Sequence, residues 1–427
     1  MSQLNRFFDR HARIVWWQQE KLMDARVLVV GAGALGNEVI KNLALLGIGN
    51  LLIVDFDTIE DTNLSRAVLF RQGDAKNGAK KAEVAARRAK LLNPHSKSVA
   101  KAFHGDIVWE MGLGVFRYAD VIVGCLDNIE ARLAVNLTCR KLGKTWIDGG
   151  MWELAGSVSV YDCTDEEKAC YECGMTPEHY RAIRTRYSCT NAVVKTRIQQ
   201  GFEPTTQTTS ALVGAFQSQE VVKLLHNIPS FSGRRLMLNG EPHSFIDNEN
   251  SPAYLIDLSR NQNCLCHQET PFSNVIQFEN ICYQTPLQEF FNILHERFGP
   301  NPLTIDLERI FVMSADCPYC GKSISINKPL YRIKDNEVVC PDCEVICPTC
   351  GTKNKGVPDC VNCGQEDIYE PRLNKFTKIS EQDDWYQANI TTTLADVGVP
   401  PLQVLSILTE AERFLVELTG DKPMFWR

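Results

Sequence analysis

Residues 26–36 read R-V-L-V-V-G-A-G-A-L-G, and this stretch decides the fold of the chain. An apolar run that ends in glycines is typical of a strand that is buried in a parallel sheet and leads directly into a helix. Gly31 and Gly33 allow a tight turn and a close approach of the backbone to a phosphate, and Gly36 lets the helix pack on its strand. The first backbone N–H groups of that helix then face an anion.

A second apolar run, at 51–54, ends in Asp55. A carboxylate about 20 residues after the glycines is well placed to accept hydrogen bonds from a ribose. The two runs together predict a nucleotide-binding βαβ unit. The glycine pattern most often binds a dinucleotide redox cofactor, so the identity of the nucleotide depends on the residues that follow.

The segment after Asp55 carries polar side chains that a hydride-transfer site does not require. Asp57, Asn63, Arg66 and Lys81 supply a carboxylate, an amide and two cations where a bound triphosphate would extend. Such groups stabilise charge on bridging oxygens and on departing pyrophosphate during attack on a nucleotide phosphorus. We therefore favour attack on a nucleotide phosphorus over hydride transfer. The alternative is a solvated charged loop.

A further buried strand is predicted at 119–127, where the sequence A-D-V-I-V-G-C-L-D ends in Asp127. The carboxyl ends of such strands line the ligand crevice of an α/β sheet. Because Mg²⁺ binds one or two carboxylates together with phosphate oxygens, Asp127 is a candidate for holding Mg²⁺ against the phosphates. The runs at 145–150 and 156–161 continue the sheet.

The 17 cysteines are distributed unevenly, and eight of them form four C-x-x-C pairs between positions 317 and 363. This spacing matches tetrahedral thiolate ligation of Zn²⁺. The simplest pairing gives two zinc ribbons, with cross-braced pairing as the alternative. The ribbon ligands are Cys317, Cys320, Cys340 and Cys343 in one set, and Cys347, Cys350, Cys360 and Cys363 in the other.

A third metal-type pair, Cys170 and Cys173, has its partners almost a hundred residues later in the sequence C-L-C-H. Cys264 with either Cys266 or His267 completes four ligands. Cys266 is included in the predicted ligand set, although the unusual C-x-C spacing leaves that choice open. In a chain without an export signal, metal binding is a better interpretation of these cysteines than disulfide bonds.

Cys189 lies outside any C-x-x-C pair, in the sequence R-A-I-R-T-R-Y-S-C-T. Its basic neighbours, Arg181, Arg184, Arg186 and Lys195, favour the thiolate, which is the nucleophilic form of cysteine. Cys189 is therefore a candidate nucleophile, the alternative being a buried structural cysteine. The polar stretch 201–210 predicts a surface loop, with 208–210 capping a buried helix over 211–225.

The bulk composition predicts a globular protein of two or three domains. The chain has 427 residues, of which 44% are hydrophobic, and 45 Lys and Arg stand against 52 Asp and Glu. The net charge of −7 argues against nucleic acid as the main partner. No apolar run has membrane-spanning length and no signal-peptide pattern precedes the first strand, so we expect a cytoplasmic protein with no membrane partner.

Both ends of the chain carry patterns outside the nucleotide unit. The stretch 5–19 resembles an amphipathic helix, in which Arg10 or Arg13 reaches a nucleotide phosphate of its own or a partner subunit; the alternative is a packing helix. Near the other end, 272–312 predicts a strand, the helix 287–298 and a second strand. A helix at 403–411 and a strand at 413–418 are expected to complete a small domain with it.

These motifs together resemble the ThiF and ubiquitin-activating E1 superfamily over roughly residues 6–267. The resemblance rests on G-A-G-A-L-G, D-F-D-T-I-E-D-T-N-L-S-R, G-A-K-K-A, D-N-I-E-A-R, C-Y-E-C and the run S-A-L-V-G-A-F-Q-S-Q-E-V-V-K. The overall layout is most similar to single-chain E1-like proteins of bacterial ubiquitin-like conjugation operons. Members of the superfamily adenylate the C-terminal glycine of a ubiquitin-like protein with ATP and Mg²⁺.

The resemblance implies a role for each matching residue. Asp55 would bind ribose, Asp127 would hold the metal, and the phosphates would be bound by Asn63, Arg66 and Lys81. An alanine, Ala67, stands here where glutamine usually follows the arginine. The loop before Lys81 is about two residues longer than usual, so Lys80 is an alternative to it.

The resemblance also implies partners. Cys189 precedes a threonine, as the thioester cysteine of E1 enzymes does, so an E2-like conjugating enzyme would receive the carrier from it. The chain would form a homodimer, which suits an arginine that acts across the interface. One alternative is a ThiF/MoeB-type adenylyltransferase that serves a sulfur carrier and has no E2. Another is a scaffold that has lost catalysis.

The predicted fold class is α/β, with a Rossmann-like ThiF/E1 adenylation domain, a zinc-ribbon segment and a small α+β module. The adenylation domain, with the thioester-cysteine segment and a crossover loop, spans 1–268. The zinc ribbons span 314–370. The small module combines 269–313 with 371–427 and is a candidate for recruiting the E2 or the carrier.

Overall fold

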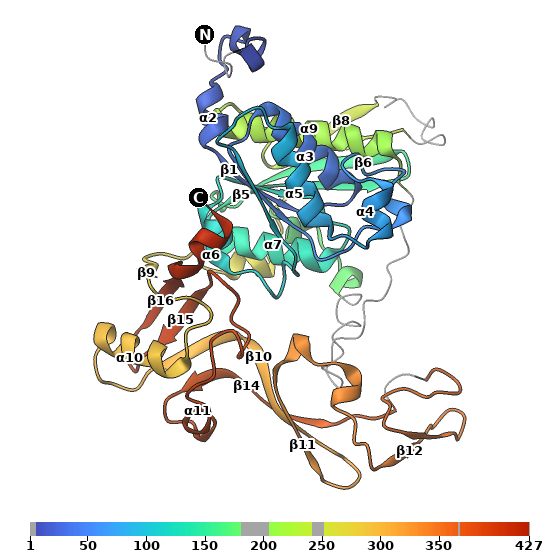
Figure 1. The fold of residues 1–427 in the computed structure, drawn as a ribbon, viewed down its shortest axis with the longest axis vertical. Coiled ribbons are helices and arrows are strands. Elements are labelled where there is room, and N and C mark those ends of the chain that lie inside the picture. Colours follow the sequence, from blue (N-terminus) through green and yellow to red (C-terminus); the bar gives the residue numbers. More distant parts are fainter. Residues whose placement is uncertain (1–5, 181–204, 241–251, 366–367, 427) are drawn as a thin grey trace. The chain divides into compact units, whose positions relative to one another are not determined.

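The computed structural model describes residues 6–180, 205–240, 252–365 and 368–426. These residues form two compact units (Figure 1). The first takes in the described residues up to 175, those from 205 to 273, and 422–426. The second is built mainly from 274–421. Among the described residues, no helix combines the length and the apolar character needed to cross a lipid bilayer.

The first unit is organised on a large sheet with the strand order β3-β2-β1-β4-β5-β6-β7-β8. Its strands are β1 (Arg26–Val30), β2 (Asn50–Val54), β3 (Val99–Phe103), β4 (Val121–Gly124), β5 (Thr145–Trp152), β6 (Ala155–Asp162), β7 (Arg234–Leu238) and β8 (Ala253–Asp257). Neighbouring strands from β3 to β5 are parallel, and those from β5 to β8 are antiparallel. The predicted α/β class with a parallel-rich sheet is confirmed.

Helices cover both faces of this sheet. They are α2 (Gln19–Asp24), α3 (Ala34–Leu46), α4 (Gln72–Lys76), α5 (Lys81–Leu92), α6 (Leu113–Tyr118), α7 (Ile129–Leu142), α9 (Gln207–Leu225) and α12 (Lys422–Phe425), with short 3₁₀ helices η1 (His11–Arg13), η2 (Asp61–Asn63), η3 (Tyr171–Gly174) and η4 (Leu265–Gln268). On β5, Gly149 faces Leu35 of α3 and Gln217 of α9, whereas the adjacent Asp148 contacts Arg132 of α7. Because successive strand residues point to opposite faces, α3 and α9 cover one face and α7 the other.

Strand β1 pairs in parallel with β2 on one side and with β4 on the other, so the strand order reverses between β1 and β4. Both strands are buried apolar runs, as expected for strands packed by helices on both faces. In open α/β sheets, ligands bind outside the carboxyl ends of the strands at this kind of switch point. The predicted nucleotide residues follow β1, β2 and β4, so the fold brings them to this edge.

The second unit contains a sheet with the order β11-β10-β15-β16-β9, in which β14 also pairs with β10. Its elements are β9 (Ile276–Phe278), α10 (Leu287–Phe298), β10 (Thr304–Asp316), β11 (Ser323–Pro329), η5 (Leu330–Arg332), η6 (Asp335–Glu337), β12 (Glu344–Ile346), β13 (Lys353–Lys355), β14 (Arg372–Ser380), α11 (Asp384–Ala388), β15 (Val404–Leu408), β16 (Arg413–Leu418) and η7 (Thr419–Asp421). Phe290 and Phe291 of α10 belong to its core, with Ile305 of β10 and Ile407 of β15. The expected α+β module is present.

Three local predictions were wrong. The expected helix at 403–411 is strand β15, because its backbone pairs with β10 on one side and β16 on the other. The expected helix at 5–19 is interrupted: η1 ends at Arg13, and Ile14 has an extended backbone, as suits a β-branched residue. The cap of α9 is Thr206, whose hydroxyl accepts the N–H of Thr209, rather than a residue of 208–210.

The last residues of the chain belong to the first unit, although the sequence assigned them to the small module. Trp426 is buried, and its indole N–H donates to the carbonyl of Val115 across 3.0 Å. The ammonium of Lys422 lies 4.0 Å from the ring centroid of Tyr118. These contacts fix α12 beside α6 (Figure 1).

Candidate nucleotide and metal sites

The three predicted glycines meet three different spatial requirements. Gly31 has a φ of +98°, and a Cβ there would lie 2.2 Å from the carbonyl oxygen of Cys125. At Gly36 a Cβ would lie 2.0 Å from the carbonyl oxygen of Gly31, so only a glycine lets α3 start this close to β1. A Cβ on Gly33 would meet nothing within 4 Å. The open space at Gly33 fits a phosphate at the N-terminus of α3.

Asn37, which the sequence analysis missed, holds the glycine turn in place. Its side-chain amide donates to the carbonyls of Ala32 (2.7 Å) and Gly33 (2.9 Å) and accepts the backbone N–H of Leu69 (2.8 Å). Asn37 is fully buried. A polar residue within the apolar face of α3 was the available signal, because a buried amide needs several partners.

Asp55 lies directly after β2 and is fixed by backbone donors. Its carboxylate accepts the N–H groups of Ala32 and Asp57, both at 2.7 Å. Burial raises the pKa of Asp55, while Lys81 and these two N–H groups oppose the rise. The bond to Ala32 places this carboxylate against the glycine turn, as the predicted ribose contact requires.

Lys81 and Lys80 have different surroundings at the start of α5. The ammonium of Lys81 lies 3.0 Å from a carboxylate oxygen of Asp57, and the side chain is only 12% exposed. Lys80 is 46% exposed and pairs with Glu83 at 3.1 Å. The geometry therefore favours Lys81 over Lys80 for contact with a nucleotide in the crevice.

Asn63 and Arg66 lie on the segment between β2 and α4. The Asn63 side-chain oxygen accepts the backbone N–H of Glu60 (3.0 Å), so its NH₂ group is left as a donor. The guanidinium of Arg66 is half-buried and has no hydrogen bond or ion pair with any residue that the structure describes. Both groups remain candidates for phosphate contact.

Asp127 follows β4 on the loop that leads into α7. Its exposed carboxylate accepts a long hydrogen bond, 3.3 Å, from the side chain of Asn128. Asn128 in turn caps α7 by accepting the N–H of Ala131 at 2.8 Å. A carboxylate open to solvent at this edge is a suitable oxygen donor for Mg²⁺, which keeps several waters and phosphate oxygens as its other ligands.

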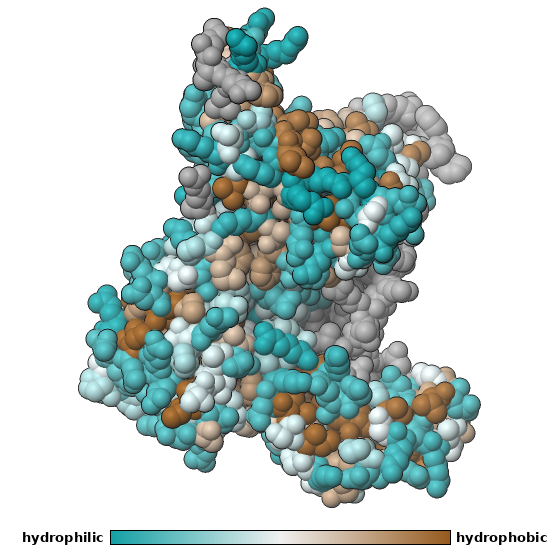
Figure 2. Space-filling view, viewed as in Figure 1, coloured by the Kyte–Doolittle hydropathy of each residue, from teal (hydrophilic) through white to brown (hydrophobic). Residues whose placement is uncertain are grey.

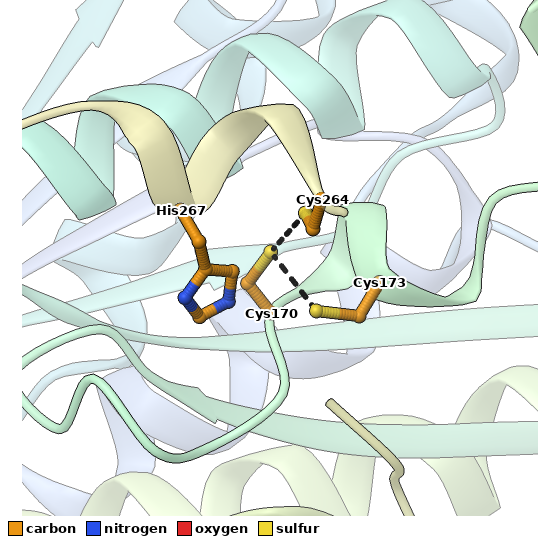
Figure 3. Close-up of side chains that lie close together, drawn as sticks. All are labelled: Cys170, Cys173, Cys264 and His267. Carbon is orange, nitrogen blue, oxygen red and sulfur yellow. Dashed lines mark hydrogen bonds between the residues drawn. The ribbon is translucent and has the colours of Figure 1, made fainter. Parts of the chain in front are cut away.

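Cys170, Cys173, Cys264 and His267 form a cluster in the first unit (Figure 3). Their ligand atoms all lie within 4.8 Å of one another. The Sγ atom of Cys170 is 3.8 Å from that of Cys173 and 3.7 Å from that of Cys264. Tetrahedral zinc with Zn–S bonds of about 2.3 Å requires sulfur atoms about 3.8 Å apart, and disulfide sulfurs lie about 2.05 Å apart. The spacing therefore fits a metal.

His267, not Cys266, supplies the fourth ligand atom of this cluster. Residues three apart in a 3₁₀ helix lie on the same side, so Cys264, the N-cap residue of η4, and His267 within η4 face the cluster together. Both ring nitrogens of His267 are buried without a hydrogen-bond partner among the described residues, as a metal ligand would be in the absence of metal. The Cys266 thiol instead accepts the side-chain amide of Asn136 at 3.1 Å.

The eight C-terminal ligands form two consecutive clusters, as the sequence predicted, and not a cross-braced arrangement. Four sulfur–sulfur distances in the two clusters lie between 3.4 and 3.9 Å. Gly321, Gly351 and Gly364 each follow a C-x-x-C pair, have φ near +70°, and donate their N–H to the first cysteine of that pair. The pattern C-x-x-C-G is the sequence signal for this turn.

The sequence predicted two further functional regions. Cys189 and its neighbours Arg181, Arg184, Arg186 and Lys195 lie outside the described residues. Near the N-terminus, Arg10 is exposed, and Arg13 pairs with Asp9 at 2.8 Å on the surface. Neither arginine has a contact with the glycine turn among the described residues.

Comparison with known proteins gives a family match over the nucleotide unit and beyond. The sequence model of the ThiF family matches residues 3–257. The chain is 30% identical over 270 residues to the sulfur carrier protein adenylyltransferase of Thermus thermophilus, covering 62% of this chain and 90% of that protein. It is 37% identical over 155 residues to SUMO-activating enzyme subunit 2 of Dictyostelium discoideum, covering 36% of this chain and 22% of that protein.

The comparison also gives two further similarities. The adenylyltransferase and sulfurtransferase MOCS3 of Xenopus laevis is 32% identical over 222 residues, which is 52% of this chain and 45% of that protein. The chain thus spans less than half the length of two of these three relatives. The crystal structure of E. coli MccB with ATP matches 59% of this chain and 69% of its own, at 23% identity and a TM-score of 0.45.

We predict that the purified protein holds three zinc ions, and that His267→Ala reduces the content to two, because the first cluster then lacks a ligand. Cys266→Ala is the matched control from the same helix and should keep all three. Elemental analysis of the proteins checks both. Full zinc content in His267→Ala together with loss in Cys266→Ala would show that Cys266 is the ligand.

Proposed function

Since this chain belongs to the ThiF family, we propose that it uses ATP to adenylate the C-terminal glycine of a ubiquitin-like protein. The observation that carries the proposal is the gathering of nucleotide-type residues at the carboxyl ends of β1, β2 and β4. An open glycine turn, a backbone-fixed carboxylate at Asp55, a largely buried Lys81 and an exposed Asp127 meet at this edge. Such a set suits binding and cleavage of a nucleoside triphosphate.

In the proposed reaction, a carboxylate oxygen of the carrier glycine attacks the α-phosphorus of ATP. A new P–O bond forms to the glycine while the bond between the α-phosphorus and the bridging oxygen breaks, and pyrophosphate leaves with that electron pair. Lys81 and Arg66 are the cations that offset the charge on the phosphates, and Asn63 donates to a phosphate oxygen. Asp55 accepts hydrogen bonds from the ribose hydroxyls, which orients the nucleotide.

Asp127 is proposed to hold Mg²⁺ beside the phosphates. A bound Mg²⁺ would supply further neutralisation of charge on the phosphate oxygens. The donor type fits, since a solvent-exposed carboxylate is what this cation prefers, and the position after β4 adjoins the glycine turn through the contact of Gly31 with Cys125.

We further propose that Cys189 receives the activated glycine. Its thiolate attacks the acyl carbon, a thioester forms, and AMP leaves with the electron pair of the acyl–oxygen bond. The basic residues around Cys189 in the sequence support this role, because cations lower the pKa of a thiol. An E2-like enzyme would then take the carrier, and the small α+β module of the second unit is our candidate for recruiting that enzyme or the carrier.

A second candidate function is favoured by one specific comparison. The Thermus thermophilus protein, of which this chain covers 90%, is named a sulfur carrier protein adenylyltransferase. In that case adenylation would be the same, but the activated carboxylate would receive sulfur, and no E2 would take part. The two functions share the nucleotide site and separate only at Cys189.

We also propose that the chain forms a homodimer through an apolar surface beside its N-terminal segment. A cavity of about 850 Å³ there is lined mainly by apolar side chains of the N-terminal segment, α3 and α9, with a few polar ones among them. Trp16 is 48% exposed and Leu45 is 50% exposed, and Figure 2 shows apolar side chains exposed on this unit. A second copy of the chain packed on this apolar surface would remove the surface from contact with water. The same contact would bring Arg10 or Arg13 to a partner subunit.

The adenylation proposal predicts that the protein exchanges labelled pyrophosphate into ATP when supplied with a cognate ubiquitin-like protein that ends in glycine. Asp127→Ala should lose most of this exchange, by roughly 3 kcal/mol in the barrier, as for removal of other electrostatic stabilisers. The control Asp257→Ala removes an exposed carboxylate from the edge strand β8 and should exchange normally. Wild-type exchange by Asp127→Ala would reject the role of that residue.

For Cys189, the expected result separates the two candidate functions. Cys189→Ala should retain pyrophosphate exchange but form no thiol-sensitive adduct with the carrier, because the nucleophile is absent. Gel analysis with and without reducing agent detects that adduct. Cys282→Ala, which changes a half-buried cysteine of the second unit, serves as the control. An adduct that persists in Cys189→Ala places the nucleophile elsewhere, and wild type that adenylates the carrier without any thioester supports the sulfur-carrier function.

Light scattering of the full chain tests the homodimer. The wild type should have twice the monomer mass, and Leu45→Lys should be monomeric because it buries a charge in the proposed contact. Leu91→Lys replaces a side chain of α5 that is 79% exposed and outside the cavity, so it should remain dimeric. A monomeric wild type, or a dimer that Leu45→Lys leaves intact, would contradict this interface.

A further inference from the structure

Helix α7 begins two residues after Asp127, and its first full turn carries Arg132. The Arg132 side chain turns back toward the strand ends instead of pointing along the helix surface. Its guanidinium donates to the carbonyl of Leu126, to the carbonyl of Gly149 (3.1 Å) and to a carboxylate oxygen of Asp148 (3.1 Å). Leu126 is the residue directly before Asp127. Arg132 thus fixes the peptide group that leads into the candidate magnesium ligand.

This arrangement is buried and electrostatically balanced. The side chains of Arg132 and Asp148 are only 15% and 9% exposed. Burial lowers the pKa of Arg132, but Asp148 and Tyr171 act against burial and the pKa is raised overall, so the guanidinium stays charged. Asp127 also contributes to the rise. A planar fork of donors that meets three fixed acceptors is more rigid than a flexible ammonium could be.

Asp127 itself has little else to hold it. Among the described residues, its carboxylate accepts only the 3.3 Å hydrogen bond from Asn128, and it is exposed to solvent. The orientation of its side chain therefore depends on the backbone of the loop between β4 and α7. That backbone is tied at Leu126 by Arg132 and at the helix start by the Asn128 cap.

We propose that Arg132 is a positioning residue: by holding the Leu126 carbonyl beside Asp148 and Gly149 of β5, it sets Asp127 in the orientation that binds Mg²⁺ with ATP. This inference rests on the proposed function, since it takes Asp127 as the magnesium ligand. Residues that orient a metal ligand typically change metal affinity about 10-fold to 100-fold when they are replaced. Arg132 itself touches neither the nucleotide nor the metal in this account.

Isothermal titration calorimetry of the full chain with ATP, in buffer with and without Mg²⁺, tests the proposal without any carrier protein. For the wild type, Mg²⁺ should tighten ATP binding. Arg132→Lys keeps the charge but loses the fork, so the gain from Mg²⁺ should shrink by roughly tenfold while binding of ATP without Mg²⁺ stays the same. Asp127→Ala should lose the gain entirely, and the double variant should behave like Asp127→Ala.

Arg140→Lys is the matched control, because Arg140 is a buried arginine on the same helix, about two turns after Arg132, and is paired with Glu166 at 3.4 Å. It should keep the full gain from Mg²⁺, and the zinc content of all variants should equal that of the wild type. A full gain in Arg132→Lys would overturn the proposal. So would a further loss of ATP affinity in the double variant relative to Asp127→Ala, because Arg132 would then act independently of Asp127.

The titrations and the pyrophosphate exchange assay together distinguish failure of this proposal from failure of the proposed function. A wild type that gains ATP affinity from Mg²⁺ through Asp127 and Arg132, yet exchanges no pyrophosphate with any ubiquitin-like protein, would refute adenylation and support the positioning role. A wild type whose ATP binding does not respond to Mg²⁺ would overturn the role of Arg132.

Discussion

The close approach of α3 to the end of β1 is the constraint on which the nucleotide site depends. A side chain at Gly36 would collide with the carbonyl of Gly31, and a side chain at Gly31 would collide with the carbonyl of Cys125, the residue after β4. Because both residues are glycines, the helix can start at the point where the strand order reverses. Asn37 completes the turn by binding two of its carbonyls and the backbone of Leu69. Because of this packing, the helix N-terminus is open toward a phosphate.

Side chains of helix α7 contact both candidate sites of the first unit, the nucleotide site and the Cys₃His cluster. Near its start, Arg132 fixes the carbonyl before Asp127. One turn later, the buried Asn136 accepts the N–H of Tyr171 at 3.0 Å and donates to Cys266, so it touches both segments that supply the Cys₃His cluster. A metal in that cluster would tie together chain segments that lie almost a hundred residues apart. We therefore expect a metal in this cluster to stabilise the face of the sheet that α7 covers.

Local requirements could be predicted from the sequence, and choices made by distant contacts could not. The roles of Gly31, Gly33 and Gly36 follow from spacing, because the steric need for glycine is local. The C-terminal cysteine clusters follow from C-x-x-C repeats for the same reason. The choice of His267 over Cys266 depends on how η4 packs against Cys170 and Cys173, almost a hundred residues earlier. Strand β15 depends on β10, about a hundred residues earlier in the chain. The hydrogen bonds of Arg132 also depend on long-range packing, since one acceptor, the carbonyl of Gly149, lies on β5 and not on its own helix.

In the proposed reaction, this chain would cleave ATP between the α- and β-phosphates by attack of a protein C-terminal carboxylate. Chromatography of the products from α-labelled ATP tests it directly, with a cognate ubiquitin-like protein and with the same protein lacking its C-terminal glycine. We predict AMP bound to the intact carrier, with pyrophosphate released, and no reaction with the shortened carrier. Release of ADP and phosphate, or AMP formation that does not depend on the glycine, would contradict the account.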